Sequence, residues 1–306
     1  MTHRRIVLVT GASGFIGRHS LLPLIHRGYE VHAVSRNFTK TTLPTGVNSH
    51  SVDLLDTQAI RRLVRSVSAT HLLHFAWYVS HGKFWEAPEN LSWTSASLSL
   101  IREFSEEGGK RVVLAGSCGE YDWGYSLCDE LLTPLNPATL YGTCKKCVHA
   151  ISARYGSNAA LSVATGRIFF LYGPHEPQSR LVPSVILSLL AGRTANCTHG
   201  RQIRDFLHVE DAGAYFAALI DSSIEGPVNI ASGNPVSIAE LVQFIGKEIG
   251  RPDLIRLGAI PLSPTEPMDL RAEVRRLREE LGVNQARSLS DGIRDTIAWW
   301  RNNYPR

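Results

Sequence analysis

The feature that most constrains the fold is a glycine-rich segment that directly follows a short apolar run near the N-terminus. The run Ile6–Thr10 has the β-branched, apolar character of a buried strand, and Gly11, Gly14 and Gly17 follow it at intervals of three. Glycines at a strand-to-helix junction let the backbone turn tightly and approach a pyrophosphate at the N-terminus of the next helix. A plain tight turn would use the same glycines, but their position after a first strand favours a dinucleotide-binding loop.

Strand-like and helix-like segments alternate through the first half of the chain. The strand-like runs are continuously apolar instead of alternating, which indicates a sheet covered on both faces. This alternation predicts an α/β fold of Rossmann type, with a doubly wound parallel sheet and right-handed crossovers. The expected strands are 6–10, 30–35, 49–52, 71–76, 111–115 and 161–168, and the expected helices are 16–27, 57–66, 90–107 and 141–155.

The rhythm changes after Phe170, where a turn-rich loop begins. We expect a strand running into a helix within 201–220, a further strand within 226–233, and helices at 181–191, 237–249, 271–281 and 289–302. The helix at 237–249 starts with a capping-box pattern at Ser237 and Glu240. Residues 1–170 are therefore predicted to form a Rossmann domain that binds the dinucleotide. Residues 171–306 are predicted to form a smaller, intercalated and mainly substrate-binding lobe, with about 204–231 returning to the first domain.

Composition narrows the class of protein. The 306 residues are 43% hydrophobic and 20% charged, which is the balance of a folded protein. A net charge of +4 without a dense Lys/Arg block suits an anionic small substrate and gives no reason to expect nucleic acid as a partner. The apolar run Ile6–Val9 is too short for a signal peptide, and the longest apolar stretch, Leu181–Leu190, is interrupted by Pro183. We expect a soluble, cytoplasmic protein with no membrane partner.

The five cysteines are an odd number spread along the chain, which favours a reducing compartment over a disulfide framework. Cys144 and Cys147 have half of a zinc-site spacing but no second pair, and the twelve histidines show no ligand spacing. No metal site is expected.

The end of the second predicted strand bears on the choice of dinucleotide. A carboxylate there would bind the ribose 2′-hydroxyl of NAD, whereas an arginine accommodates the 2′-phosphate of NADP. The chain has Ser35, Arg36 and Asn37 at this place and no carboxylate. Because a guanidinium pairs well with phosphate, we predict NADP(H), with NAD(H) as the alternative and a solvated surface role for Arg36 left open.

Tyr141 and Lys145 lie four residues apart, on one face of a predicted helix. A free tyrosine has a pKa of about 10, and a nearby cation favours the phenolate, so Lys145 is expected to lower the pKa of Tyr141. Ser117 follows the fifth strand, at the edge where open α/β sheets bind ligands. Its hydroxyl is suited to orient a substrate oxygen while Tyr141 exchanges the proton.

Together these motifs resemble the extended short-chain dehydrogenase/reductases, the epimerase/dehydratase group that contains UDP-galactose 4-epimerase, nucleotide-sugar dehydratases and GDP-fucose synthase. The resemblance covers essentially the whole chain and includes 10–17, 53–54, 74–76, 117–121, Tyr141 with Lys145, 171–174 and 204–209. It implies Ser117, Tyr141 and Lys145 as catalytic residues and Arg204 as the holder of the substrate's diphosphate. It also implies a line of cofactor contacts at Gly11, Ser13, Gly14, Phe15, Ile16, Gly17, Ser35, Arg36, Asn37, Asp53, Leu54, Phe75, Ala76, Trp77, Tyr141, Lys145 and Ile168.

Departures from the family pattern narrow the reaction. Dehydratases have an Asp-Glu pair directly after the catalytic hydroxyl residue, where this chain has Cys118 and Gly119. GDP-fucose synthase has a cysteine and a histidine where this chain has Gly119 and Arg180. We therefore expect neither elimination nor epimerisation at carbons three and five. The leading hypothesis is NADPH-dependent reduction of a nucleotide-linked 4-keto-6-deoxyhexose. The alternatives are a nucleotide-sugar 4-epimerase with tightly bound NAD(H) and a non-catalytic NADP-binding sensor.

Further residues are candidates for the substrate site. Besides Ser117, Tyr141 and Arg204, we expect contacts from Cys118, Glu120 and Lys83. Lys83 belongs to the aromatic run Trp77–Trp85, which serves either the substrate or the packing between lobes. A structural salt bridge from Arg204 to Asp205 or Asp211 is the alternative to its substrate role. The resemblance also implies a homodimer built from the helices at 90–107 and 141–155.

Overall fold

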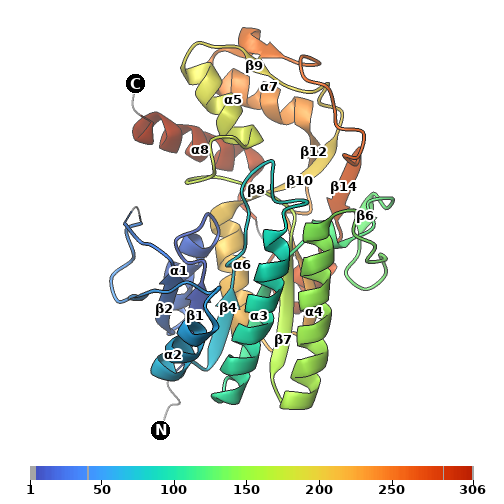
Figure 1. The fold of residues 1–306 in the computed structure, drawn as a ribbon. Coiled ribbons are helices and arrows are strands. Elements are labelled where there is room, and N and C mark those ends of the chain that lie inside the picture. The colour runs from blue at the N-terminus through green and yellow to red at the C-terminus, as the bar shows by residue number, and fades with distance from the viewer. Residues whose placement is uncertain (1–4, 40, 285, 305–306) are drawn as a thin grey trace.

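The computed structural model describes residues 5–39, 41–284 and 286–304, and its centre is a seven-stranded sheet (Figure 1). The strand order is β11-β7-β5-β4-β1-β2-β3, and every neighbouring pair is parallel. The strands are β1 (Ile6–Thr10), β2 (Glu30–Ser35), β3 (Asn48–Ser51), β4 (His71–His74), β5 (Arg111–Ser117), β7 (Ser162–Ile168) and β11 (Gly226–Ile230). Residues 1–4, which hold basic residues preceding β1, lie outside the described residues.

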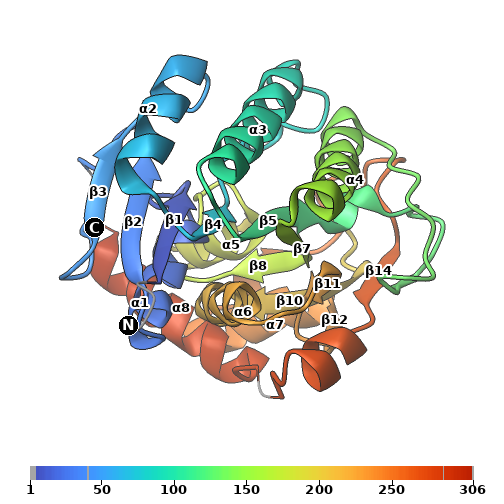
Figure 2. The same cartoon turned by 90° about the horizontal axis from the view of Figure 1, so that it is seen from below.

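Helices cover both faces of this sheet, as Figure 2 shows. On one face lie α2 (Thr57–Val67), α3 (Glu89–Glu106) and α4 (Leu140–Ala159), and on the other lie α1 (Gly17–His26) and α6 (Val209–Asp221). Because both faces are covered, a central strand has no solvent side, and all seven residues of β5 are buried. The predicted Rossmann-type parallel sheet is confirmed.

A second, mixed sheet, a separate pair of short parallel strands and three helices form most of the rest of the described chain. The sheet has the order β12-β10-β14-β6, with β8 paired to β10, and only β12 runs antiparallel to its neighbour. Figure 1 shows α5, α7 and α8 grouped at one end of the large sheet, above it in this view. The elements are β6 (Leu127–Cys128), β8 (Phe170–Tyr172), α5 (Leu181–Leu190), β9 (Ala195–Asn196), β10 (Ile203–His208), β12 (Pro235–Ser237), α7 (Ile238–Ile249), β13 (Ile255–Arg256), β14 (Asp269–Ala272) and α8 (Leu289–Asn303).

Short turns complete the list: 3-10 turns at Cys118–Glu120 and Pro252–Leu254, and a π turn at Arg276–Glu280. The predicted capping box is present, since Ser237 Oγ accepts from Glu240 N at 3.1 Å and Ser237 N donates to Glu240 Oε2 at 2.9 Å. The helix predicted at 271–281 is confirmed only in its second part, as the π turn at Arg276–Glu280, and its first residues are wrong. Residues 269–272 form β14, which pairs with β10 and β6, because pairing between strands outweighs local helix propensity.

The chain crosses between the two sheets more than once. After β10 in the second sheet, α6 packs on α1 and β11 joins the large sheet beside β7. The division into domains at residues 170 and 171 stays a prediction.

Candidate active site

The glycine-rich loop joins β1 to α1 with its backbone tightly packed. Gly11 has a φ of 67°, and a Cβ there would lie 2.8 Å from the backbone nitrogen of Ala76. A Cβ on Gly17 would overlap the carbonyl oxygen of Gly11, to which Gly14 N donates at 2.9 Å. Side chains are therefore excluded here, and α1 begins without a side-chain cap. This bare helix start fits the pyrophosphate of a dinucleotide.

The predicted contacts for the adenosine half lie at the ends of β2 and β3. Ser35 lies 2.5 Å, Oγ to Oγ, from Ser13 of the glycine loop. Arg36 and Asn37 are exposed, and across the part of the chain that the structure describes the Arg36 side chain makes no hydrogen bond or ion pair. Asp53 is exposed and accepts from Leu55 N at 3.0 Å, while Leu54 is buried.

The segment after β4 runs beside the glycine loop. Phe75 N donates to Thr10 O at 3.1 Å, and Ala76 N donates to Thr10 Oγ1 at 3.4 Å. Trp77 is buried, and its Nε1 donates to Asn90 Oδ1 at 2.8 Å. On the neighbouring strands, Ile168 is in register with Ser117. The expected cofactor and catalytic residues therefore gather at the carboxyl edge of the sheet, where open α/β sheets bind ligands.

Ser117, Tyr141 and Lys145 come together at this edge. Ser117 ends β5, and its Oγ accepts from Gly119 N at 3.1 Å. Tyr141 is the second residue of α4, and its phenol interacts with the Ser117 side chain. Lys145, one helical turn on, lies with Nζ 5.8 Å from the centre of the Tyr141 ring and donates to Ala115 O at 2.8 Å. All three residues are less than one-tenth exposed.

Burial sets the protonation of this group of residues. It raises the pKa of the Tyr141 phenol above its ordinary value and lowers the pKa of Lys145 to about 7. The Lys145 ammonium faces the Ala115 carbonyl and lies 3.9 Å from the centre of the Trp77 ring. Desolvation is therefore the largest influence on the pKa of Tyr141 in this structure, and the lowering of that pKa by Lys145 stays a prediction.

Aromatic rings surround Tyr141. The Phe84 and Trp85 rings meet it edge-on at 4.9 and 5.7 Å, and Tyr141 N donates to Trp85 O at 2.9 Å. Much of the run Trp77–Trp85 thus packs against the Tyr141 helix, although Trp85 keeps 37% of its surface exposed. Lys83 is exposed.

Two residues next to this site were not predicted from the sequence to belong to it. Trp123 meets Trp85 edge-on at 5.7 Å, and its Nε1 donates to Cys118 O at 3.2 Å. The charge of Arg180, the residue before α5, acts to lower the pKa of Tyr141, and its Nε is buried without a hydrogen-bond partner among the described residues. No spacing in the sequence indicates that Trp123 belongs to the site. For Arg180, the one indication is that it stands where GDP-fucose synthase has a histidine.

Glu120 differs from its expected role as a substrate contact, whereas the contact expected from Cys118 stays a prediction. Glu120 is fully buried: its Oε1 accepts from Ser117 N at 2.8 Å, and its Oε2 accepts from Arg167 Nε at 3.1 Å. Burial alone would raise the pKa of Glu120, but its contacts with His149 and Arg167 lower it. The carboxylate thus fixes the turn that follows Ser117 through hydrogen bonds to the Ser117 amide and to Arg167. Burial raises the pKa of the Cys118 thiol to about 12, which makes it unreactive.

Arg204 is 2% exposed and forms neither of the expected alternative salt bridges. Its Nη2 donates to Glu266 Oε1 at 2.9 Å and to Pro267 O at 2.6 Å. Asp205 instead accepts from Ser232 and Gly233, and Asp211 accepts from Arg287 N. The anion paired with Arg204 is therefore supplied by a segment distant in sequence.

Over residues 5–39, 41–284 and 286–304, no helix is long and apolar enough to cross a membrane, and no three His, Cys, Asp or Glu side chains gather as metal ligands would. All five cysteines are free thiols. The cytoplasmic location stays a prediction.

The chain belongs to the NAD dependent epimerase/dehydratase family, whose sequence profile matches residues 7–231. It is 25% identical to UDP-glucose 4-epimerase of Erwinia amylovora, over 97% of this chain and 98% of that protein. It is 24% identical to UDP-glucuronic acid decarboxylase 1 of Xenopus tropicalis, over 97% of this chain and 72% of that protein.

Solved structures agree with this membership. The UDP-glucose 4-epimerase of Thermus thermophilus in complex with NAD superposes with a TM-score of 0.85 at 25% identity, covering 97% of this chain and 99% of that one. MoeE5 in complex with UDP-glucuronic acid and NAD superposes with a TM-score of 0.81 at 26% identity, with the same coverage.

Proposed function

We propose that the protein is a nucleotide-sugar 4-epimerase that works with a tightly held NAD(H). The observation that carries the proposal is the group Ser117, Tyr141 and Lys145 beside the glycine loop, in a chain that aligns with UDP-glucose 4-epimerases over nearly its whole length. This choice replaces the ketoreductase favoured from the sequence, because the relatives with the widest coverage include 4-epimerases and both of the similar structures named above contain NAD.

Bound NAD would supply hydride chemistry: a hydride would leave carbon four of the sugar and return to the opposite face of the resulting ketone, which inverts that carbon. The glycine loop and the start of α1 would hold its pyrophosphate, and Lys145 would hold the ribose. Tyr141 would exchange the proton on the oxygen of carbon four, and Ser117 would hold that oxygen by a hydrogen bond. As the hydride leaves carbon four, Tyr141 would accept the proton of the hydroxyl on that carbon, and it would give the proton back when the hydride returns.

One observation favours NADPH-dependent reduction of a 4-keto sugar nucleotide as a second candidate. Arg36 is exposed at the end of β2 and unpaired among the described residues, with no carboxylate beside it to repel a 2′-phosphate. Reduction would use the same residues, with Tyr141 protonating the new alkoxide.

A substrate panel distinguishes the two candidates. UDP-, dTDP-, GDP- and CDP-hexoses are offered with NAD⁺, and the corresponding 4-keto-6-deoxy sugars with NADPH. An epimerase interconverts the first set with no net change in cofactor absorbance, whereas a reductase consumes one NADPH for each keto sugar. For the reductase we also expect Arg36→Ala to weaken NADPH binding more than NADH binding.

Tyr141→Phe tests the chemistry. Loss of the exchangeable proton should lower kcat by about 10²- to 10⁴-fold and leave dinucleotide affinity nearly unchanged. Tyr155→Phe on the same helix is the matched control and should keep full turnover. Full turnover in Tyr141→Phe would exclude the mechanism.

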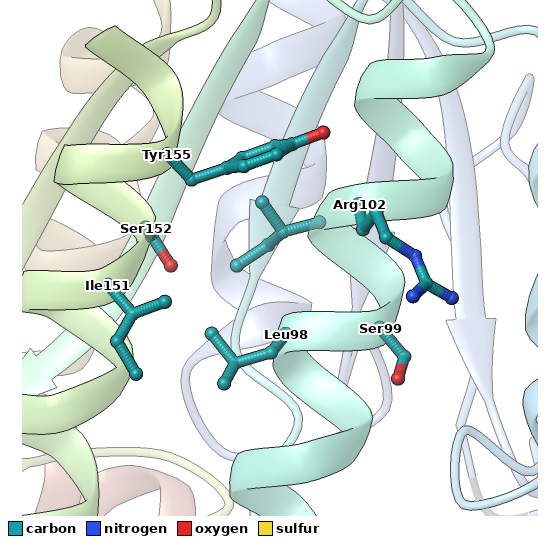
Figure 3. A pocket seen from close by; sticks show the side chains of 7 residues that line it. Leu98, Ser99, Arg102, Ile151, Ser152 and Tyr155 are labelled. Atoms are coloured by element: carbon teal, nitrogen blue, oxygen red, sulfur yellow. The ribbon is translucent and has the colours of Figure 1, made fainter. Parts of the chain in front are cut away.

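We also propose a homodimer that pairs α3 and α4 of two chains. Figure 3 shows Leu98 of α3 pointing toward Ile151, Ser152 and Tyr155 of α4 across a pocket of about 240 Å³, which Ser99 and Arg102 also line. Leu91 and Ile151 are 57% and 49% exposed on these two helices. Exposed apolar side chains around a hollow support an interface there.

A further inference from the structure

Arg204 combines deep burial with a charge partner that lies in solvent. The arginine is 2% exposed, whereas Glu266, whose Oε1 lies 2.9 Å from the guanidinium, is 40% exposed. Arg204 also donates to Ile203 O at 2.9 Å and to Pro267 O at 2.6 Å. Two of its five donors are therefore used by backbone carbonyls, and a third is used by the carboxylate of Glu266.

The guanidinium lies beside the candidate active site. It is 5.2 Å from the centre of the Phe170 ring. Its charge also acts on the thiol of Cys118, the residue after Ser117. An anion bound to Arg204 would therefore lie close to a substrate that reacts at Ser117 and Tyr141.

Glu266 sits on a segment that is fixed mainly at its two ends. Ile260 N donates to Cys197 O at 3.1 Å, and Ile203 N donates to Met268 O at 2.8 Å. Within residues 261–267 the other hydrogen bonds of the described structure are local, such as Glu266 N to Ser263 O at 3.1 Å. The contacts with Arg204 thus tie this segment to the body of the protein, and releasing Glu266 breaks few other bonds.

We propose that Glu266 competes with the substrate's phosphate groups for Arg204, so that a nucleoside diphosphate binds by displacing this carboxylate. The inference rests on the proposed function, in which Arg204 holds the diphosphate. Carboxylate and phosphate oxygens use the same guanidinium donors. A phosphate held by Arg204 would lie near the Glu266 carboxylate, and the two anions would repel each other. Glu266 therefore lowers the affinity of every ligand that places an anion on Arg204.

Glu266→Gln tests the proposal because it removes the charge and keeps the shape. We expect UDP, dTDP, GDP or CDP, whichever binds the wild type most tightly, to bind E266Q about tenfold more tightly in isothermal titration calorimetry. Glu279→Gln, at an exposed glutamate in the π turn, is the matched control and should change affinity less than about twofold. In a protein that already carries Arg204→Gln, the further change Glu266→Gln should leave the affinity for the nucleoside diphosphate unchanged.

Equal affinities of the wild type and E266Q would overturn the displacement, as would a gain that survives the loss of Arg204. Absence of nucleoside diphosphate binding to both proteins would overturn it too. Turnover of nucleotide sugars by the wild type decides the proposed function separately. Melting temperatures of the variants confirm that each one is folded before its affinity is compared.

Discussion

At the scale of single residues, the buried pair Glu120–Arg167 is the group on which the position of Ser117 depends. Glu120 is fully buried and Arg167 is 1% exposed, and Arg167 also donates to Tyr121 Oη at 3.1 Å and Glu130 O at 3.3 Å. A buried ion left without its partner cannot recover its hydration. The pair therefore holds the turn after β5 in one conformation.

Glu120→Gln should lower the free energy of unfolding by about 3 kcal/mol or more, because Arg167 keeps a buried charge with no counter-ion. Urea unfolding followed by circular dichroism measures the change. The control is Glu107→Gln, which breaks the exposed pair with Arg65 and should cost about 0.5 kcal/mol or less. Similar losses in the two variants would show that the buried pair has no special role.

Lys145 gives a pH dependence of stability. Its pKa in the folded protein is about 7, whereas in the unfolded chain it is the ordinary 10.5. Between these values the unfolded chain binds more protons than the folded one, so stability rises with pH from about 7 to 10. Lys145→Met removes this contribution. The difference in unfolding free energy between the wild type and this variant should therefore shift in favour of the wild type as pH rises, and a difference independent of pH would contradict the depressed pKa.

Residue types and spacing predicted Ser117, Tyr141 and Lys145, because their chemistry needs only a strand end and one helical turn. Glu120 and Arg204 could not be placed in this way. Their partners Arg167 and Glu266 lie 47 and 62 residues further along the chain, and no local pattern records such a contact. The charge of each residue is known from the sequence, but its ion-pair partner is known only from the folded structure.

At the scale of elements, α4 and the turn after β5 are in direct backbone contact. A Cβ on Gly142 would overlap the carbonyl oxygen of Gly119 and lie 2.9 Å from Pro137 Cβ. Only glycine at position 142 lets the start of α4 lie this close to the backbone of Gly119. This close packing brings Tyr141 next to Ser117.

Gly142→Ala should therefore lower kcat by at least about tenfold and destabilise the fold by about 1–3 kcal/mol, although alanine is the better helix former. Cys147→Ala, at an exposed position of the same helix, tests helix propensity alone and should leave kcat unchanged. Normal turnover by the Gly142 variant would contradict this expectation, because it would show that the turn after β5 can move away from α4 without displacing Ser117. Steady-state kinetics and thermal melting provide both readouts.

The elements that were predicted well are those with a strong local signal. The continuous apolar runs gave β1 and β2 at their observed bounds, and the capping box gave the start of α7. Residues 269–272 lacked such a signal: the Arg-rich tail has helical composition, and its pairing with β6 and β10 depends on strands more than sixty residues away. Pairing of that kind is decided by the assembled fold.

At the scale of the whole molecule, the order of elements along the chain explains how the two parts are joined. The chain leaves the large sheet after β7, enters the second sheet through β8 and β10, and returns through α6 to β11. Arg204 on β10 and Ser117 on β5 are thereby fixed to one another through two sheets that share a covalent crossover. A substrate bound between them would contact both parts of the molecule.

The proposed dimer is tested at the same scale. In light scattering after size exclusion, the wild type should have twice the chain mass of 33.8 kDa. Ile151→Asp places a charge on the exposed apolar face of α4 and should give monomers, because an unpaired carboxylate cannot be buried there without a large desolvation cost. Leu22→Asp is the control, since Leu22 is equally exposed (49%) on α1, across the sheet, and should leave the dimer intact. A monomeric wild type would contradict the proposed dimer. It would not contradict the proposed activity, because the predicted active-site residues all come from one chain.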